Sequence, residues 1–290
     1  MLLDRDTYAL ASGVEKLLGP DGLKTELFSC FLETNTPVCA NVFEARDEIV
    51  RLRRLAAERA AREGLLVAAA GSHPFSLPEE QQVVQEERYL RMLEELGDKA
   101  RGQIVFGLHV HVGMESFEQC LRVLGWVTPR LPALVALSAN SPYLAGAETG
   151  RLSSRIGRLH ELPRSGPPPA FGSVAEWEAA VEREGVDYTR IWWDARAHPR
   201  LGTLEVRAPD QATSVERSVA LVALVQALCA APPGPTDDIV AAVEPAAREL
   251  GTWSLLQTLR EPPEAERQLD VGRRLNLVAV AADLAARTAA

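Results

Sequence analysis

The sequence lacks the cysteine pairs and short glycine motifs that identify many common sites. Its four cysteines are widely spaced and form no CxxC pair, which argues against zinc-ribbon and thioredoxin-like sites and for reduced thiols. No GxxxxGK(S/T), GxGxxG or GxSxG pattern occurs. This absence excludes the P-loop, the Rossmann phosphate-binding turn and the nucleophile elbow of α/β-hydrolases. A nucleotide, if one binds, must be held by another architecture.

Long apolar runs and an excess of positive charge are missing as well. No run of 18 apolar residues occurs, and the segment after Met1 lacks the pattern of a signal peptide. We therefore expect a cytoplasmic protein that does not use a membrane as a partner. The net charge of −9 argues against nucleic acid as a partner. The chain does have 290 residues, 47% of them apolar, which is enough for a sizeable core.

Helical and extended patterns alternate irregularly along the chain, which predicts an α+β fold with a mostly antiparallel sheet and flanking helices. The predicted helices are 41–63, 79–97, 116–139 (in two pieces), 174–184 and 215–230. The predicted strands are 65–70, 103–113 and 202–208, and a long loop is predicted at 147–173. We expect residues 1–230 to form the core domain and residues 231–290 a helical segment packed on it.

The predicted strand 103–113 carries the strongest sign of a site. Because side chains alternate along a strand, His109 and His111 share one face while apolar residues occupy the other. Imidazoles at this spacing can ligate a metal or contact a phosphate. The alternative is a pair of histidines on a solvated sheet face.

Two other strands repeat this pattern. In 202–208, Glu205 and Arg207 share a polar face opposite Leu204 and Val206, so they could hold Mg²⁺ and a phosphate oxygen side by side. In 28–37, Glu33 lies on a face with other polar residues, although the pattern is weaker. The alternative for both strands is an ordinary surface carboxylate or cross-strand ion pair.

The loop at 147–173 concentrates arginine in an acidic protein. Four arginines lie within fourteen residues, with one glutamate opposing them: Arg151, Arg155, Arg158 and Arg164. This favours a loop that covers a substrate pocket and meets a small anion. The alternative is a solvated loop, because most charged runs are solvated.

Eight segments, in order along the chain, carry a resemblance to a known family. They are 33–39, 70–75, 107–113 (Gly-Leu-His-Val-His-Val-Gly), 136–142, 149–155, 162–168, 193–199 and 202–207 (Gly-Thr-Leu-Glu-Val-Arg). Together they resemble the bacterial type 2 glutamate–cysteine ligases, a family of carboxylate–amine ligases in the glutamine-synthetase-like superfamily. The resemblance covers roughly residues 1–230.

The resemblance implies a glutamine-synthetase-like catalytic fold in which an antiparallel sheet forms one wall of an ATP and metal site. The implied reaction phosphorylates the carboxylate of glutamate, or of a similar amino acid, with ATP, and an amine then attacks the acyl phosphate. The family's positions on the metal side, which would bind Mg²⁺ or Mn²⁺, correspond to Glu33, His109 and Glu205 in this sequence. Positions with a catalytic role match Arg155, Arg164 and Arg207. Positions that bind the cofactor match His111, Arg196 and Asn140.

Two segments of the family pattern have no counterpart here. These are an initial strand of the type Gly-Val-Glu-Glu-Glu and a stretch like Glu-Asn-Arg-Trp-x-Ala after residue 230. We expect either a start upstream of Met1 or a lost strand whose exposed neighbour pairs with another chain, most simply in a homodimer. The alternatives to an active ligase are a non-catalytic relative that binds nucleotide or amino acid, and a metal-dependent hydrolase on the same scaffold.

Overall fold

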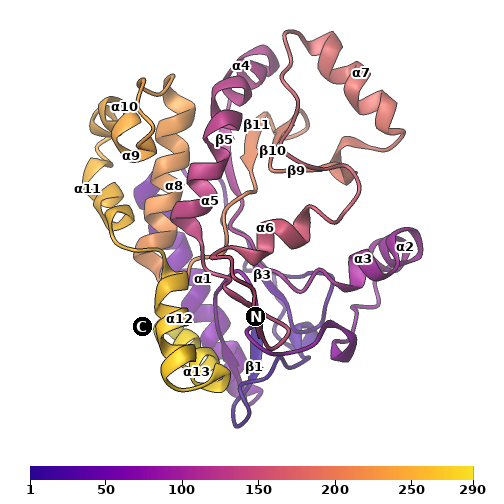
Figure 1. Ribbon diagram of the computed structural model, residues 1–290. Helices are drawn as coiled ribbons and strands as arrows, with labels where there is room; N and C mark the ends of the chain where they lie inside the picture. Colours follow the sequence, from indigo (N-terminus) through magenta and orange to yellow (C-terminus); the bar gives the residue numbers. More distant parts are fainter. Residues whose placement is uncertain (290) are drawn as a thin grey trace.

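The computed structural model describes residues 1–289 and combines many helices with short strands (Figure 1). The helices are α1 Val42–Arg62, α2 Glu87–Leu96, α3 Asp98–Arg101, α4 Phe117–Val127, α5 Leu131–Ser138, α6 Ser154–Leu159, α7 Val174–Glu184, α8 Val215–Ala230, α9 Ile239–Ala242, α10 Glu244–Glu249, α11 Trp253–Leu256, α12 Glu264–Arg274 and α13 Leu277–Ala289. The strands are β1 Leu2–Asp4, β2 Leu23–Thr25, β3 Leu32–Thr34, β4 Leu65–Val67, β5 Val110–Gly113, β6 Tyr143–Leu144, β7 Ala147–Glu148, β8 Ser165–Gly166, β9 Trp192–Trp193, β10 Ala195–His198 and β11 Thr203–Val206. The predicted α+β class is confirmed.

The strands of residues 1–289 form several small sheets instead of one. The largest has the order β10-β11-β5 and is antiparallel throughout. Antiparallel pairs also join β1 to β4, β2 to β3 and β6 to β7, and a parallel pair joins β8 to β9. Glu33, expected on the metal side with His109 and Glu205, lies in β3, which belongs to a different sheet from β5 and β11. Both edges of β11 are taken by β10 and β5, and β3 pairs with β2 instead.

The main core lies on the apolar face of the three-stranded sheet. Leu204 and Val206 of β11 are fully buried there, together with Ala195 and Ala197 of β10. Helices α4 and α8 pack against this face, and α8 is buried on nearly all sides, as its apolar sequence requires. The predicted alternation along 202–208 is therefore confirmed, and it turns Glu205 away from this core.

The predicted helix 79–97 begins later than expected, at Glu87. Before it, Pro78–Glu80 forms a single 3₁₀ turn, and the next residues are extended. They are extended because they pair with a distant backbone: Ser29 N–H donates to the Gln82 carbonyl at 2.8 Å, and Val84 N–H donates to the Leu27 carbonyl at 3.0 Å. Such long-range pairing overrides local helix propensity.

The segment 147–173 is also more ordered than the predicted loop, because it contains β7, α6 and β8. Its backbone groups find partners far away in the sequence. Ser154 N–H donates to the Ser141 carbonyl at 3.0 Å, and the Arg164 carbonyl accepts a hydrogen bond from Trp192 N–H at 2.8 Å. The glycines and prolines of this segment hide these elements from local pattern analysis.

One stretch, Phe117–Ser138, is long and apolar enough to cross a membrane by length and composition. It consists of α4, a 3₁₀ turn and α5, and its Leu121, Leu124 and Leu134 are buried in the main core. A core helix of a soluble protein has this same composition.

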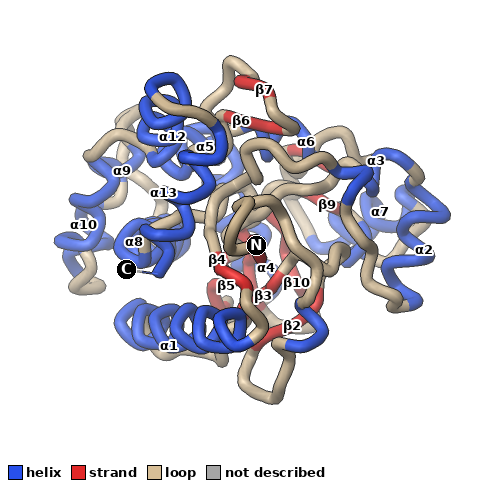
Figure 2. Tube along the Cα trace, turned by 90° about the horizontal axis from the view of Figure 1, so that it is seen from below, coloured by secondary structure: helices blue, strands red, loops and turns tan. Residues whose placement is uncertain are grey.

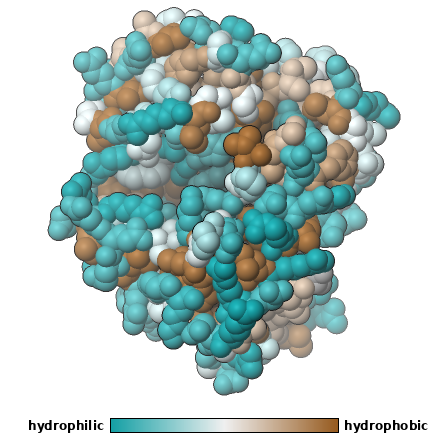
Figure 3. Space-filling view, turned by 180° about the vertical axis from the view of Figure 1, so that it is seen from behind, coloured by the Kyte–Doolittle hydropathy of each residue, from teal (hydrophilic) through white to brown (hydrophobic). Residues whose placement is uncertain are grey.

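The C-terminal helices surround one end of α8 and extend to α1. Figure 2 shows α9 and α10 beside α8, and α13 packs against α1 and β4. The face of the molecule that is turned away from the viewer in Figure 1 is mostly hydrophilic, with scattered apolar residues and a recess above its middle (Figure 3).

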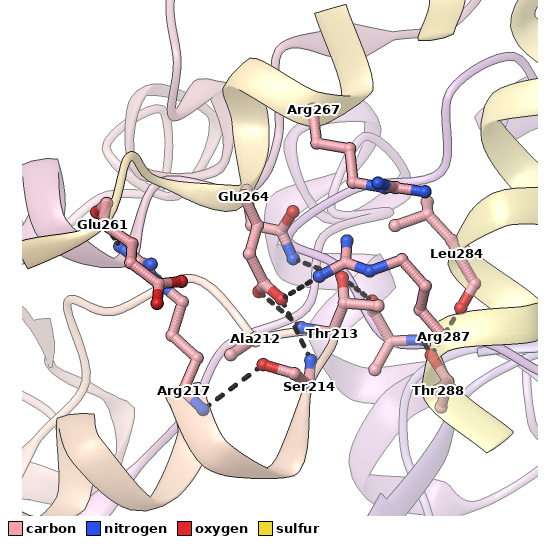
Figure 4. Close-up of polar contacts among 12 residues, drawn as sticks. Ala212, Thr213, Ser214, Arg217, Glu261, Glu264, Arg267, Leu284, Arg287 and Thr288 are labelled. Atoms are coloured by element: carbon pink, nitrogen blue, oxygen red, sulfur yellow. Dashed lines mark hydrogen bonds and ion pairs between the residues drawn. The ribbon is translucent and has the colours of Figure 1, made fainter. Parts of the chain in front are cut away.

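A buried carboxylate fastens α12 to the start of α8 (Figure 4). Glu264 accepts hydrogen bonds from the backbone N–H groups of Thr213 and Ser214 at 2.7 and 3.0 Å. Arg287 of α13 donates to the same carboxylate at 3.0 Å. Glu264 therefore ties three helices together and supplies acceptors for N–H groups at the N-terminus of α8.

Candidate functional site

The polar face of the three-stranded sheet gathers charged side chains from every strand. Arg196 of β10, Glu205 of β11 and His111 of β5 lie opposite one another in the sheet register. His109, just before β5, approaches the same carboxylate, as does Arg207, just after β11. The alternation of the sequence therefore correctly predicts that His109, His111 and Glu205 share one face.

Glu205 is buried and is bound from both sides by guanidinium groups. Its Oε2 accepts a hydrogen bond from Arg196 Nε at 2.8 Å, and its Oε1 accepts one from Arg207 Nη1 at 2.6 Å. Burial alone would raise the pKa of Glu205, but Arg207 and Arg196 outweigh it and hold that pKa well below its usual range. Glu205 is thus an ionised centre that keeps two arginines in fixed positions.

His109 and His111 lie beside this ion-paired group. His109 Nδ1 and His111 Nε2 are 3.9 and 3.6 Å from Glu205 Oε1, which is too far for direct hydrogen bonds. Burial lowers the pKa of both rings, and Arg207 lowers that of His109 further. Yet 41% of the His109 side chain is exposed, so solvent reaches the ring. A neutral, accessible imidazole of this kind can accept a ligand proton or a cation.

Two carboxylates, Glu26 and Glu33, lie on one side of the β2–β3 pair, and the charge of Arg207 acts on Glu26. Glu33 is opposite Lys24 in the register, so Glu26, two residues after Lys24, points to the same side. Burial raises the pKa of Glu26, and the neighbouring charge of Glu33 raises it further, although Arg207 acts in the opposite direction. Sequence analysis missed Glu26, which follows β2 and could have been found by extending the alternation from Lys24.

The predicted metal set is not a ready-made site. In the part of the chain that the structure describes, no three His, Cys, Asp or Glu side chains converge closely enough to hold a metal ion. Both oxygens of Glu205 already accept hydrogen bonds from arginines. Glu26 and Glu33 do offer the oxygen donors that a hard cation prefers, and they point to the same side of the β2–β3 pair. Mg²⁺ is often bound by one or two carboxylates plus substrate phosphates. These residues fit a metal that arrives with a phosphate.

Asn140, predicted to bind the cofactor, is fully buried and has no free polar atom to offer. Its Nδ2 donates to the Gln211 carbonyl and to Thr213 Oγ1, both at 2.9 Å. Its Oδ1 accepts a hydrogen bond from Gln268 of α12 at 2.7 Å. The geometry does not support contact with a cofactor, because Asn140 joins α12 to the segment after β11.

Arg155, predicted to have a direct catalytic role, is also buried, with 3% of the residue exposed. Its Nη1 donates to the Ala208 carbonyl at 2.9 Å, and its Nη2 donates to the Arg207 carbonyl at 3.0 Å. The guanidinium group therefore binds main chain, and the geometry does not support direct contact with a substrate.

Arg164 is held away from the sheet by its own partners. Its Nη2 donates to Glu95 of α2 at 2.9 Å, its Nε donates to the Arg190 carbonyl, and its guanidinium lies over the Trp192 ring. Arg158 pairs with the nearby Glu161 in a similar way. Internal pairing therefore accounts for part of the arginine concentration that suggested an anionic ligand.

Two further side-chain pairs flank the site and were not found by sequence analysis. His160 Nε2 lies 2.8 Å from Oδ1 of the buried Asp194. Tyr188 Oη lies 3.2 Å from His198 Nδ1, at the end of β10. No local signal could have paired His160 with Asp194, because 34 residues separate them.

Comparison with known proteins gives a consistent result. A family model described as glutamate-cysteine ligase family 2 matches residues 4–290. A protein named "Putative glutamate--cysteine ligase 2" from Herpetosiphon aurantiacus is 39% identical over 238 residues, which cover 78% of this chain and 62% of that protein. A "Putative glutamate--cysteine ligase 2-3" from Rubrobacter xylanophilus is 41% identical over 242 residues, which cover 79% and 67%. The chain thus spans about two thirds of the length of these relatives.

Proposed function

The chain belongs to glutamate-cysteine ligase family 2, and from this premise we propose that it is an ATP-dependent ligase that joins the carboxylate of glutamate, or of a similar amino acid, to an amine. The substrates, the use of ATP and a requirement for Mg²⁺ or Mn²⁺ are parts of this proposal. The observation that carries it is the polar face on which Glu205 holds Arg196 and Arg207 beside two histidines.

The chemistry would be divided among the residues of this face. A carboxylate oxygen of the amino acid attacks the γ-phosphorus of ATP, and ADP leaves. The amine nitrogen then attacks the acyl carbon, loses a proton, and releases phosphate. Phosphoryl transfer depends on positioning and charge neutralisation, which suits Arg207. Arg196, whose Nη1 donates to three backbone carbonyls, holds Glu205 in place. Neither guanidinium is fully neutralised, because the two share one carboxylate.

Glu26 and Glu33 are the residues we assign to the metal side. A divalent cation bound there would neutralise phosphate charge and orient the transferred group. His109, uncharged and reached by solvent, lies close enough to Glu205 to share this environment. His111 is tied to Thr203 Oγ1 at 2.9 Å, which fixes the orientation of its ring.

A second candidate is a relative that binds nucleotide or amino acid without turnover. One observation favours it: among residues 1–289 no three metal-ligating side chains converge, and Glu205 is already paired with two arginines. A site with two free carboxylates would bind Mg²⁺ weakly, because hard cations need several oxygen ligands.

The test is ADP release by the purified chain with Mg²⁺, ATP, glutamate and a panel of amines. ADP release that requires both glutamate and an amine supports the ligase. Binding of ATP with Mg²⁺ but no amine-stimulated ADP release would establish the second candidate. Product formation without ATP would contradict both and would point to hydrolase chemistry.

A further inference from the structure

The backbone of Arg207 and Ala208 lies just past the end of β11, where the sheet no longer supplies partners. All four of its polar groups are nevertheless bound. Both N–H groups donate to the carbonyl oxygen of Asp194, at 2.8 and 3.1 Å. Both carbonyl oxygens accept hydrogen bonds from the Arg155 guanidinium, at 3.0 and 2.9 Å. Two residues that are distant in sequence therefore hold this backbone from opposite sides.

Arg155 reaches this position because residue 107 is a glycine. A Cβ atom at Gly107 would lie 2.0 Å from Arg155 Nη2 and 2.6 Å from its Cζ, which no packing adjustment could tolerate without moving the guanidinium. The backbone of Arg155 is anchored as well, since its N–H donates to Ser141 Oγ at 3.1 Å. Burial lowers the pKa of Arg155 only to about 10, so the group remains charged at neutral pH.

Asp194 is fixed by the same short helix. Its carboxylate is buried and lies 2.8 and 3.1 Å from Nε2 of His160, which follows the last residue of α6. Arg155, in the first turn of α6, binds the carbonyls, while His160 holds the residue that binds the N–H groups. A single helix thus controls both sides of the backbone at 207 and 208.

We infer that Arg155 and Asp194 are positioning residues for Arg207. We also infer that residue 107 is glycine because a side chain there would occupy the space of the Arg155 guanidinium. Arg207 in turn donates to Glu205 Oε1 at 2.6 Å, so a shift of its backbone changes the centre of the polar face. The role of Arg207 toward a phosphate rests on the proposed function, whereas the way in which it is held does not.

The first test concerns the geometry alone and uses thermal unfolding of four proteins: wild type, Gly107→Ala, Arg155→Met and the double variant. We expect Gly107→Ala to lower the Tm of the wild type but to have little effect once Arg155 is methionine, because the clash partner is gone. A Gly107→Ala effect of the same size in both backgrounds would overturn the assignment of Gly107 to Arg155.

The second test measures the affinity for MgATP by calorimetry. A charge-assisted hydrogen bond to phosphate that is lost or misplaced costs on the order of tenfold in affinity or more, so we expect Arg155→Met and Arg207→Met each to weaken binding at least about tenfold. The double variant should bind no more weakly than Arg207→Met alone. Losses that multiply in the double variant would show that Arg155 acts independently of Arg207.

Two more variants keep this test decisive. Arg155→Lys keeps the charge but cannot span two carbonyls, so it should behave like Arg155→Met; affinity restored by lysine would mean that Arg155 meets the ligand as a charge. Arg158→Met, on the same helix but paired only with Glu161 at the surface, is the matched control and should leave the affinity unchanged. If the wild type does not bind MgATP, the proposed function fails, while the thermal cycle still decides the positioning inference.

Discussion

Two buried glutamates of this protein, Glu205 and Glu264, each contact arginine but differ in the other partners that they bind. Glu205 is 3% exposed and its close partners are side chains, Arg196 and Arg207, with two histidines nearby. Glu264 is 6% exposed, and two of its partners are backbone N–H groups at the start of α8. Burial and charge are similar, so the nature of the partners makes the difference.

A backbone partner cannot move without unfolding the element to which it belongs, whereas a side-chain partner can. Glu264 therefore stabilises the junction of α8, α12 and α13, where its contacts have no alternative use. Glu205 holds two guanidiniums on the polar face of the sheet. Arg196 Nη1 also donates to the carbonyls of Tyr188, Thr189 and Ile191, so Arg207 is the one that an anionic ligand could share. The comparison teaches that a guanidinium bound to backbone, such as that of Arg196, belongs to the framework, whereas one paired with a carboxylate, such as that of Arg207, marks the site.

The largest expected effect is on activity. Glu205→Gln should reduce amine-dependent ADP release by on the order of 100-fold, because Arg196 and Arg207 lose the charge that positions them. Glu264→Gln should reduce the turnover of the folded protein by no more than a few fold. Steady-state kinetics on both variants checks this, and equal losses would remove the distinction between site and framework.

The second effect is on stability and on its response to phosphate. Glu264→Ala should lower the free energy of unfolding by about 3 kcal/mol, because two buried N–H groups and Arg287 lose their acceptor. Glu205→Ala leaves two guanidiniums that inorganic phosphate can bind, so its Tm should rise with phosphate more steeply than that of the wild type. Chemical denaturation with and without phosphate tests both; a phosphate response in Glu264→Ala alone would contradict the comparison.

A third effect depends on pH. The pKa of Glu205 is lower in the folded protein than in the unfolded chain, so its charge stabilises the fold above the ordinary glutamate pKa of about 4.3. Below that pH the unfolded chain takes up a proton that the folded state does not, and the contribution is progressively lost. The stability difference between wild type and Glu205→Gln should therefore be constant from pH 8 to about pH 5 and shrink below it. A difference that grows on acidification, measured by denaturant titration, would be inconsistent with this shift.

The smallest effect concerns a third glutamate, Glu95, which contacts two arginines. Arg164 and Arg190 both pair with it, but its side chain is 34% exposed. Solvent weakens such pairs, so Glu95→Gln should cost at most about 1 kcal/mol, and added salt should reduce the difference further. A salt-independent loss as large as that of Glu264→Ala would mean that burial does not govern these clusters.

Much of the framework was readable from local patterns. Period-two alternation correctly assigned Leu204 and Val206 to the core and Glu205 to the polar face, and the same rule aligned His109 with His111. The helix 215–230 agrees with α8, which begins after the N-cap Ser214. These features depend on neighbours a few residues apart, which is the range that a sequence displays directly.

The sequence by itself determined the family resemblance, the helices with clear caps, and which side chains share a face of β5 and β11. Only the tertiary structure decided which polar groups remain free. Asn140 and Arg155 look available in sequence, but both are buried and bound by partners 52 to 128 residues away. Glu26 looks like an ordinary surface residue, but folding brings it near Glu33 and Arg207. Hydrogen-bond partners and burial depend on contacts between distant segments, and no local pattern of residues encodes those contacts.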